Sequence, residues 1–160
     1  QEHRDEKPFQ QFIEDHPVIL ARFNAKKLFI KSSIIGKFQT DFAIVDTRNQ
    51  LIMIELERPS IRLFKQNGHP TAELNHAYEQ VCDWMDEYRK YPHAVLDLLN
   101  LKIEEVSAVR GAVIAGKSEG TSSENMQRHR SKNNFPGVEF LTLDELAESL
   151  LQISKDLASA

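Results

Sequence analysis

Apolar residues recur along the chain with the spacing of three helices. The clearest run covers residues 74–88, where apolar side chains fall every three or four positions, as on one face of a helix. Thr71 is a suitable N-cap residue for this helix. A first helix is predicted within Pro8–Leu20 and should end just before Pro17, and a closing helix opens at Leu143.

Five shorter segments have the composition of strands. Residues 41–45 and 51–56 are typical of central strands that are buried on both faces. A looser alternation over 23–38 predicts a strand that feeds a hairpin, and apolar runs at 109–115 and 138–141 predict two more strands. With a long polar loop between these last two, the order of elements indicates an α/β (mixed α+β) domain with helices packed on a mixed sheet.

Three carboxylates lie at the ends of the two central strands. Asp41 opens the first strand, and Glu55 and Glu57 share one face at the end of the second. Asp46 and Gln50 bound a turn signal between the strands. If these two residues close the hairpin, antiparallel pairing sets Asp41 opposite Glu55 on the same face. Because opposed buried charges repel one another, the pattern predicts a metal site.

Other interpretations of these acids stay open. Glu55 and Glu57 could be solvent-facing residues of an edge strand, although Leu51 and Met53 on the same face favour burial. Asp41 could cap a turn.

Composition and charge fit one globular domain. The 160 residues are 41% hydrophobic and 28% charged, with a formal net charge of −4, which excludes an indiscriminate polycation but leaves room for a local basic surface. No apolar run is long enough to cross a bilayer, and no signal-peptide pattern opens the chain. Cys82 is predicted to be a buried thiol. Because the chain begins with Gln1, we interpret residues 1–160 as one domain of a longer protein.

The ordered set of motifs resembles a known family. A hairpin Asp, a Glu-x-Lys motif or its substitute on the next strand, and then a long helix match the PD-(D/E)XK nuclease core. More narrowly, nearly the whole chain resembles the nuclease domain of the Shedu anti-phage defence family. The matching stretches are Phe12-Ile-Glu-Asp-His-Pro17, Asp41-Phe-Ala-Ile44, Ile54-Glu-Leu-Glu-Arg-Pro59, Leu74-Asn-His-Ala-Tyr-Glu-Gln-Val-Cys-Asp-Trp84, Ala115-Gly-Lys117 and Phe140-Leu-Thr-Leu-Asp-Glu-Leu146.

The resemblance implies a restriction-endonuclease-like core and a metal-dependent DNA endonuclease of bacterial phage defence, acting in the cytoplasm. Mg²⁺ or Mn²⁺ prefers oxygen ligands, which Asp41, Glu55 and the Leu56 carbonyl would supply. The expected partners are phage or foreign DNA and further copies of the chain. The copies would associate through this region or a missing one, and no membrane association is expected.

Two further residues match family features. Glu14, near the end of the first helix, matches a frequent helix-borne acid that binds the metal directly or through water. Gln80, four residues before Trp84, resembles the Gln-x-x-x-Tyr signature of RecB-like nucleases, in which the Gln lies next to the metal site. The ordinary alternatives are a surface acid and a solvated helix amide.

Glu57 departs from the family pattern, in which Lys is the commonest residue. A Glu cannot supply that positive charge, but it could act as a general base or as another metal ligand. The departure also supports an alternative function, a nuclease-like fold without catalysis that binds DNA or serves assembly. A carboxylate metal enzyme acting on small phosphates is a third possibility, although no Gly-rich phosphate loop is present.

Basic residues in the second half of the chain are candidate DNA contacts. Arg128, Arg130 and Lys132 cluster toward the end of the predicted loop 116–134, and Lys117 lies at its start. His69 lies in a loop near the acids. In a nuclease these side chains would contact phosphates, and otherwise they belong to a solvated surface.

Overall fold

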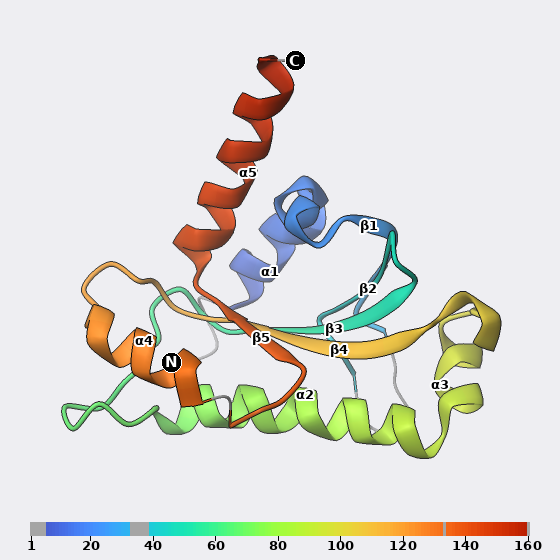
Figure 1. The fold of residues 1–160 in the computed structure, drawn as a ribbon, viewed down its shortest axis with the longest axis horizontal. Helices are drawn as coiled ribbons and strands as arrows, with labels where there is room; N and C mark the ends of the chain where they lie inside the picture. Colours follow the sequence, from blue (N-terminus) through green and yellow to red (C-terminus); the bar gives the residue numbers. More distant parts are fainter. Residues whose placement is uncertain (1–5, 33–38, 133, 160) are drawn as a thin grey trace.

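The computed structural model describes residues 6–32, 39–132 and 134–159, and its centre is a five-stranded mixed sheet. The last part of the hairpin predicted within 23–38 lies outside the described residues. In the sheet the strands follow chain order (Figure 1). They are β1 (Ala25–Ile30), β2 (Phe42–Asp46), β3 (Gln50–Leu56), β4 (Ala108–Ile114) and β5 (Val138–Leu141).

The sheet is antiparallel on one side and parallel on the other. β1, β2 and β3 pair antiparallel, whereas β3 with β4 and β4 with β5 pair parallel. The turn between β2 and β3 closes as predicted, because Asp46 Oδ1 accepts the N–H groups of Arg48 at 2.9 Å and Gln50 at 2.8 Å. Every residue of β2 is buried, and so are all but two of β3, which confirms them as central strands.

Helices cover both faces of the sheet. The helices are α1 (Glu6–Asp15), the 3-10 helix η1 (Pro17–Phe23), α2 (Ala72–Lys90), α3 (Pro92–Leu98), the 3-10 helix η2 (Ile103–Glu105), α4 (Ser123–Lys132) and α5 (Leu143–Ala158). One apolar core joins α2, α3 and α4 to the odd-numbered positions of β2 and β3. A second core joins α1, η1 and the start of α5 to the even-numbered positions.

The long helix α2 forms as its apolar spacing predicts. Its buried residues are Leu74, Ala77, Tyr78, Val81, Trp84 and Met85. The Thr71 hydroxyl accepts the Leu74 N–H at 3.4 Å and caps the first turn. Cys82, on the same helix, is half-buried, whereas the sequence predicted a buried thiol.

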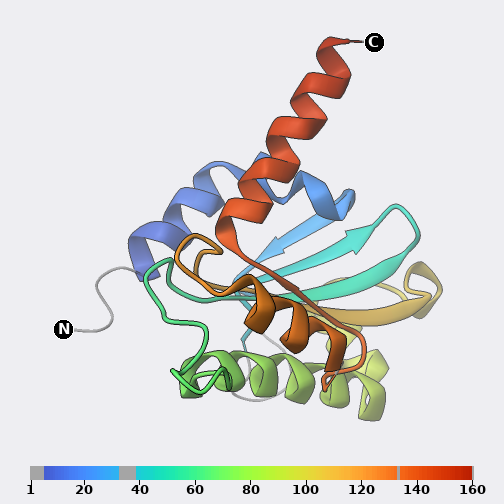
Figure 2. The same ribbon diagram turned by 60° about the vertical axis from the view of Figure 1, so that its left-hand side comes forward.

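Two parts of the chain differ from the predictions. The stretch predicted as a loop over 116–134 contains α4, which packs Met126 into the core. α5 buries only Leu146, and its second half projects from the body, leaving Leu157 75% exposed (Figure 2). Among the described residues, no helix has the length and apolar character that a membrane span requires.

Candidate functional site

The ends of β2 and β3 bring two predicted acids opposite one another. The strand register ends on the pair Phe42 and Ile54, and Asp41 and Glu55 are the residues that directly adjoin this pair. The predicted antiparallel adjacency of these two strands is therefore confirmed.

The Asp41 carboxylate completes the hydrogen bonding at this end of the sheet. Its Oδ2 accepts the Leu56 N–H at 2.8 Å, and its Oδ1 accepts the side-chain amide of Gln10 at 3.0 Å. The Asp41 side chain, just before β2 begins, thus accepts the hydrogen bond that a backbone carbonyl of a paired strand would otherwise accept. The Leu56 N–H therefore has a hydrogen-bond acceptor. Asp41 is fixed in position by both the sheet and α1.

Glu55 and Glu57 lie where β3 and β4 run side by side. Glu55 is half-buried at the end of an otherwise apolar face that includes Met53. Glu57 follows the strand and is half-buried, and its N–H donates to the Ile114 carbonyl at 2.8 Å. Pairing with β4 therefore continues past β3 and holds the backbone of both acidic positions in a fixed register.

Glu14 joins the same end of the molecule through Lys31. Its Oε1 lies 3.1 Å from the Lys31 Nζ, and the Lys31 N–H donates to the Asp41 carbonyl at 2.8 Å. Glu14 follows Gln10 by one helical turn, so α1 presents both side chains toward the start of β2. Gln80 is half-buried on α2.

The donor set fits a hard divalent ion. Asp41 and Glu55 offer carboxylate oxygens, whereas the Leu56 backbone group that contacts Asp41 is its N–H, which is a hydrogen-bond donor and not a metal ligand. Within the described ranges, no three His, Cys, Asp or Glu side chains gather into a metal-binding group. A divalent ion here would depend on two carboxylates together with backbone, water and substrate oxygens.

The predicted DNA contacts occupy three different environments. Arg128 lies on α4 and donates from Nη2 to the Gly68 carbonyl at 3.1 Å, which ties α4 to the loop carrying the exposed His69. Arg130 pairs with Glu145 at 2.7 Å and lies 5.6 Å from the Phe140 ring centre. Lys117 and Lys132 are exposed.

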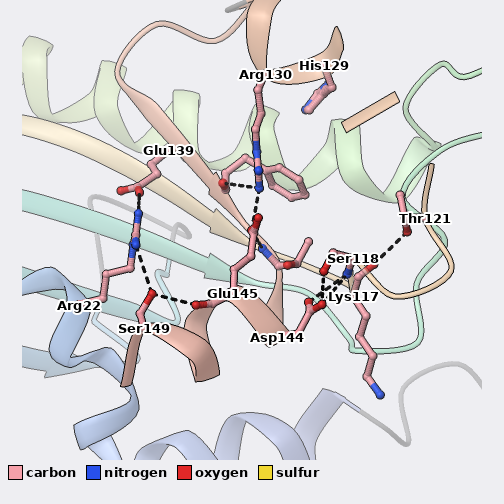
Figure 3. Close-up of polar contacts among 12 residues, drawn as sticks. Arg22, Lys117, Ser118, Thr121, His129, Arg130, Glu139, Asp144, Glu145 and Ser149 are labelled. Atoms are coloured by element: carbon pink, nitrogen blue, oxygen red, sulfur yellow. Dashed lines mark hydrogen bonds and ion pairs between the residues drawn. The ribbon is translucent and has the colours of Figure 1, made fainter. Parts of the chain in front are cut away.

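Sequence reasoning missed a polar network around α4, β5 and α5 (Figure 3). It borders a cavity of about 710 Å³ whose lining includes Arg22, Tyr78, His129 and Gln152. The Tyr78 hydroxyl and His129 Nε2 lie 2.9 Å apart. Burial raises the pKa of Tyr78, whereas burial and the charge of Arg130 lower the pKa of His129.

Asp144 is another residue that the sequence did not single out. It accepts the Ser118 N–H at 2.9 Å, and the Ser118 hydroxyl also bonds to it. Burial raises the pKa of Asp144, but the hydrogen bonds from Ser118 outweigh it and hold that pKa well below the ordinary value. The position of this Asp in the first turn of a helix was a signal that the sequence offered. Its partner Ser118, 26 residues earlier, has no such signal in the sequence.

A mixed five-stranded sheet with helices on both faces is the architecture that was predicted, that of the restriction-endonuclease-like class. The family model described as "Shedu protein SduA, C-terminal" matches residues 3–147, and the chain belongs to this family.

A comparison with solved structures finds similarity to a repair endonuclease from Pyrococcus abyssi, at 16% sequence identity and a TM-score of 0.48. The alignment covers 89% of this chain and 48% of that one, so the chain spans about half the length of the protein it matches. No curated protein matches the sequence.

Proposed function

We propose that this domain hydrolyses phosphodiester bonds of phage or foreign DNA in the bacterial cytoplasm, using Mg²⁺ or Mn²⁺, as part of phage defence. The observation that supports the proposal is that Asp41 and Glu55 directly adjoin the last antiparallel pair of β2 and β3, Phe42 with Ile54, in a chain of the Shedu family. Opposed carboxylates at one strand end are a suitable oxygen donor pair for a hard cation.

Each residue of the site has a distinct proposed role. Asp41, Glu55 and the Leu56 carbonyl hold the divalent ion, which when bound would offset charge on the phosphate and lower the pKa of the attacking water. Glu57 accepts a proton from that water as a general base. Glu14 and Gln80 support the donor pair from the helices on either face of the sheet.

Gln10 is a positioning residue for this site. Its amide donates to one oxygen of Asp41 while the Leu56 N–H donates to the other, so the carboxylate is oriented before any ligand arrives. Preorganised donors and acceptors reduce the reorganisation that binding requires.

A second candidate function is a DNA-binding or assembly module without catalysis. Glu57 stands where the family most often has Lys, and no cluster of three metal-binding side chains forms among the described residues. Both observations favour this alternative over a fully equipped active site.

Self-association of the chain stays a prediction, and size-exclusion chromatography with light scattering tests it.

Plasmid cleavage distinguishes the two functions. Wild-type protein should cut supercoiled and linear DNA in Mg²⁺ or Mn²⁺ and not in EDTA, and Asp41→Ala should be inactive. Glu57→Ala should lower the cleavage rate by about 10²- to 10⁴-fold with little change in DNA affinity, because a general base contributes in that range. Wild type no more active than Asp41→Ala, with Glu57→Lys also inactive, would establish the binding module instead.

A further inference from the structure

A cleft opens beside the acids, at the end of the sheet where β3 and β4 both terminate. It measures about 430 Å³ and is lined by the loop at 59–66 that follows β3 and by residues 117–125, which follow β4. The Glu57 N–H bond to the Ile114 carbonyl fixes the two strand ends next to one another. The cleft is therefore continuous along the backbone with the acidic positions.

Three cations line this cleft, and none of them is used to hold the fold together. Arg62, Lys65 and Lys117 are exposed, and no hydrogen bond or ion pair involves their side chains in the described part of the chain. Arg22 and Arg130, by contrast, pair at 2.7 Å with Glu139 and Glu145 respectively. The only carboxylate among the described residues that line the cleft is Glu119. The lining therefore carries an excess of positive charge in a chain whose net charge is −4.

The backbone that carries Lys117 is held rigidly on both sides (Figure 3). The Gly116 carbonyl accepts the Leu143 N–H at 3.0 Å, and the Ser118 N–H donates to Asp144 at 2.9 Å. The Thr121 hydroxyl donates to the Lys117 carbonyl at 2.9 Å. Figure 3 shows the Lys117 side chain extending away from this cluster, and Lys117 is exposed. A fixed backbone reduces the ordering that a bound anion must impose.

Gly116 shows how closely the two cleft walls approach. Its φ of +57° is in the left-handed region, and a Cβ there would lie 2.8 Å from Leu63 Cδ2. Glycine adopts this conformation without strain and leaves room for Leu63, so it favours the close approach of the chain after β4 to the wall at 59–66. The close approach of the two walls therefore depends on the residue at position 116.

We propose that this cleft binds the sugar-phosphate backbone of a DNA strand, with Lys117, Arg62 and Lys65 contacting phosphates. The inference rests on the proposed function and names the surface that takes its substrate. The one aromatic residue among the described lining, Phe64, is buried and offers no stacking face. Contacts of this kind position DNA without reading bases, so binding is independent of sequence. Lys117 also brings positive charge to the strand end where Glu57 cannot supply it.

The test is a salt titration of DNA binding in EDTA, with a labelled short duplex as the probe. The triple variant Arg62→Ala/Lys65→Ala/Lys117→Ala is compared with a charge-matched control, Lys26→Ala/Lys102→Ala/Lys155→Ala. The control residues are exposed and lie outside the cleft. The cleft variant should bind DNA at least about tenfold more weakly than wild type. Its negative slope of log K against log salt should become shallower by about 0.9 for each phosphate that the three side chains neutralise. The control should keep the wild-type slope, and two unrelated duplex sequences should give the same result.

The outcomes separate the cleft assignment from the proposed function. If the cleft variant and the control bind with equal slopes while wild type still cleaves DNA, the cleft proposal fails and the proposed function stands. If wild type neither binds nor cleaves DNA, both fail. Should the triple variant unfold, Lys117→Gln alone gives the same readout, because that side chain is exposed. A salt slope shallower by about 0.9 supports the proposal, and an unchanged slope overturns it.

Discussion

At the residue scale, Asp41 has a structural task as well as its proposed chemical one. Its two carboxylate oxygens accept hydrogen bonds from the Leu56 N–H and from Gln10. The sequence predicts Asp41 and its strand partner Glu55 from turn chemistry and alternation alone. It does not predict Gln10, because a helix amide reaching a strand from 31 residues away has no local signature.

Removing the Asp41 carboxylate should therefore destabilise the metal-free protein. Asp41→Ala leaves the Leu56 N–H without its acceptor, which costs about 1 to 3 kcal/mol of unfolding free energy. Asp41→Asn keeps an acceptor oxygen for that N–H and should cost less. Urea unfolding in EDTA measures both values. An Asp41→Ala protein as stable as wild type would mean that relief of repulsion from Glu55 offsets the missing hydrogen bonds.

Asp144 predicts a specific change in acid stability. Because hydrogen bonds from Ser118 hold its folded pKa below the unfolded value, it stabilises the fold above the unfolded pKa of about 4, and this contribution is lost as the pH falls through the folded value. Asp144→Asn should remove that dependence, so that the unfolding free energy changes less steeply with pH below about 4. Urea unfolding across acid pH measures it, with the exposed Asp97→Asn as the control. Identical acid slopes in the two variants would remove Asp144 from this role.

At the element scale, the predicted helices and strands are present, and the helix that the sequence did not predict, α4, is one without an apolar pattern. α2 and β3 follow their apolar spacing closely. α4 was missed because its ten residues are almost all polar and contribute one buried side chain, Met126. Its position depends on contacts with distant parts of the chain, Arg128 with Gly68 and His129 with Tyr78. Such contacts cannot be inferred from local pattern.

The packing of α2 on β4 predicts a size limit at Gly111. A Cβ added there would lie 2.1 Å from Val81 Cγ1 and 3.1 Å from Met85 Sδ. Gly111→Ala should lower the unfolding free energy by about 1 to 3 kcal/mol through overpacking. The double variant Gly111→Ala/Val81→Ala should be less destabilised than the sum of its single variants, because the smaller side chain makes room for the new methyl group. Strict additivity in chemical denaturation would show that the two elements do not touch here in solution.

At the scale of the whole molecule, the fold class and the sheet centre follow from the sequence, whereas the surface does not. The hairpin acids fix one end of the sheet as the candidate site. The division of basic residues between structural ion pairs and the open cleft emerges only when segments at 59–66, 117–125 and α5 come together. Arg130, predicted to contact DNA, is the clearest example, since its guanidinium pairs with Glu145.

Mg²⁺-dependent cleavage of supercoiled DNA by Glu55→Gln, beside the exposed control Glu104→Gln, tests the central claim most directly. Both substitutions remove one negative charge and keep the side-chain shape. If Glu55 is an oxygen donor of the site, Glu55→Gln should lose activity by orders of magnitude, while Glu104→Gln and wild type cleave equally and only with the divalent ion. Equal cleavage by the two variants, or undiminished cleavage by wild type in EDTA, would contradict the account.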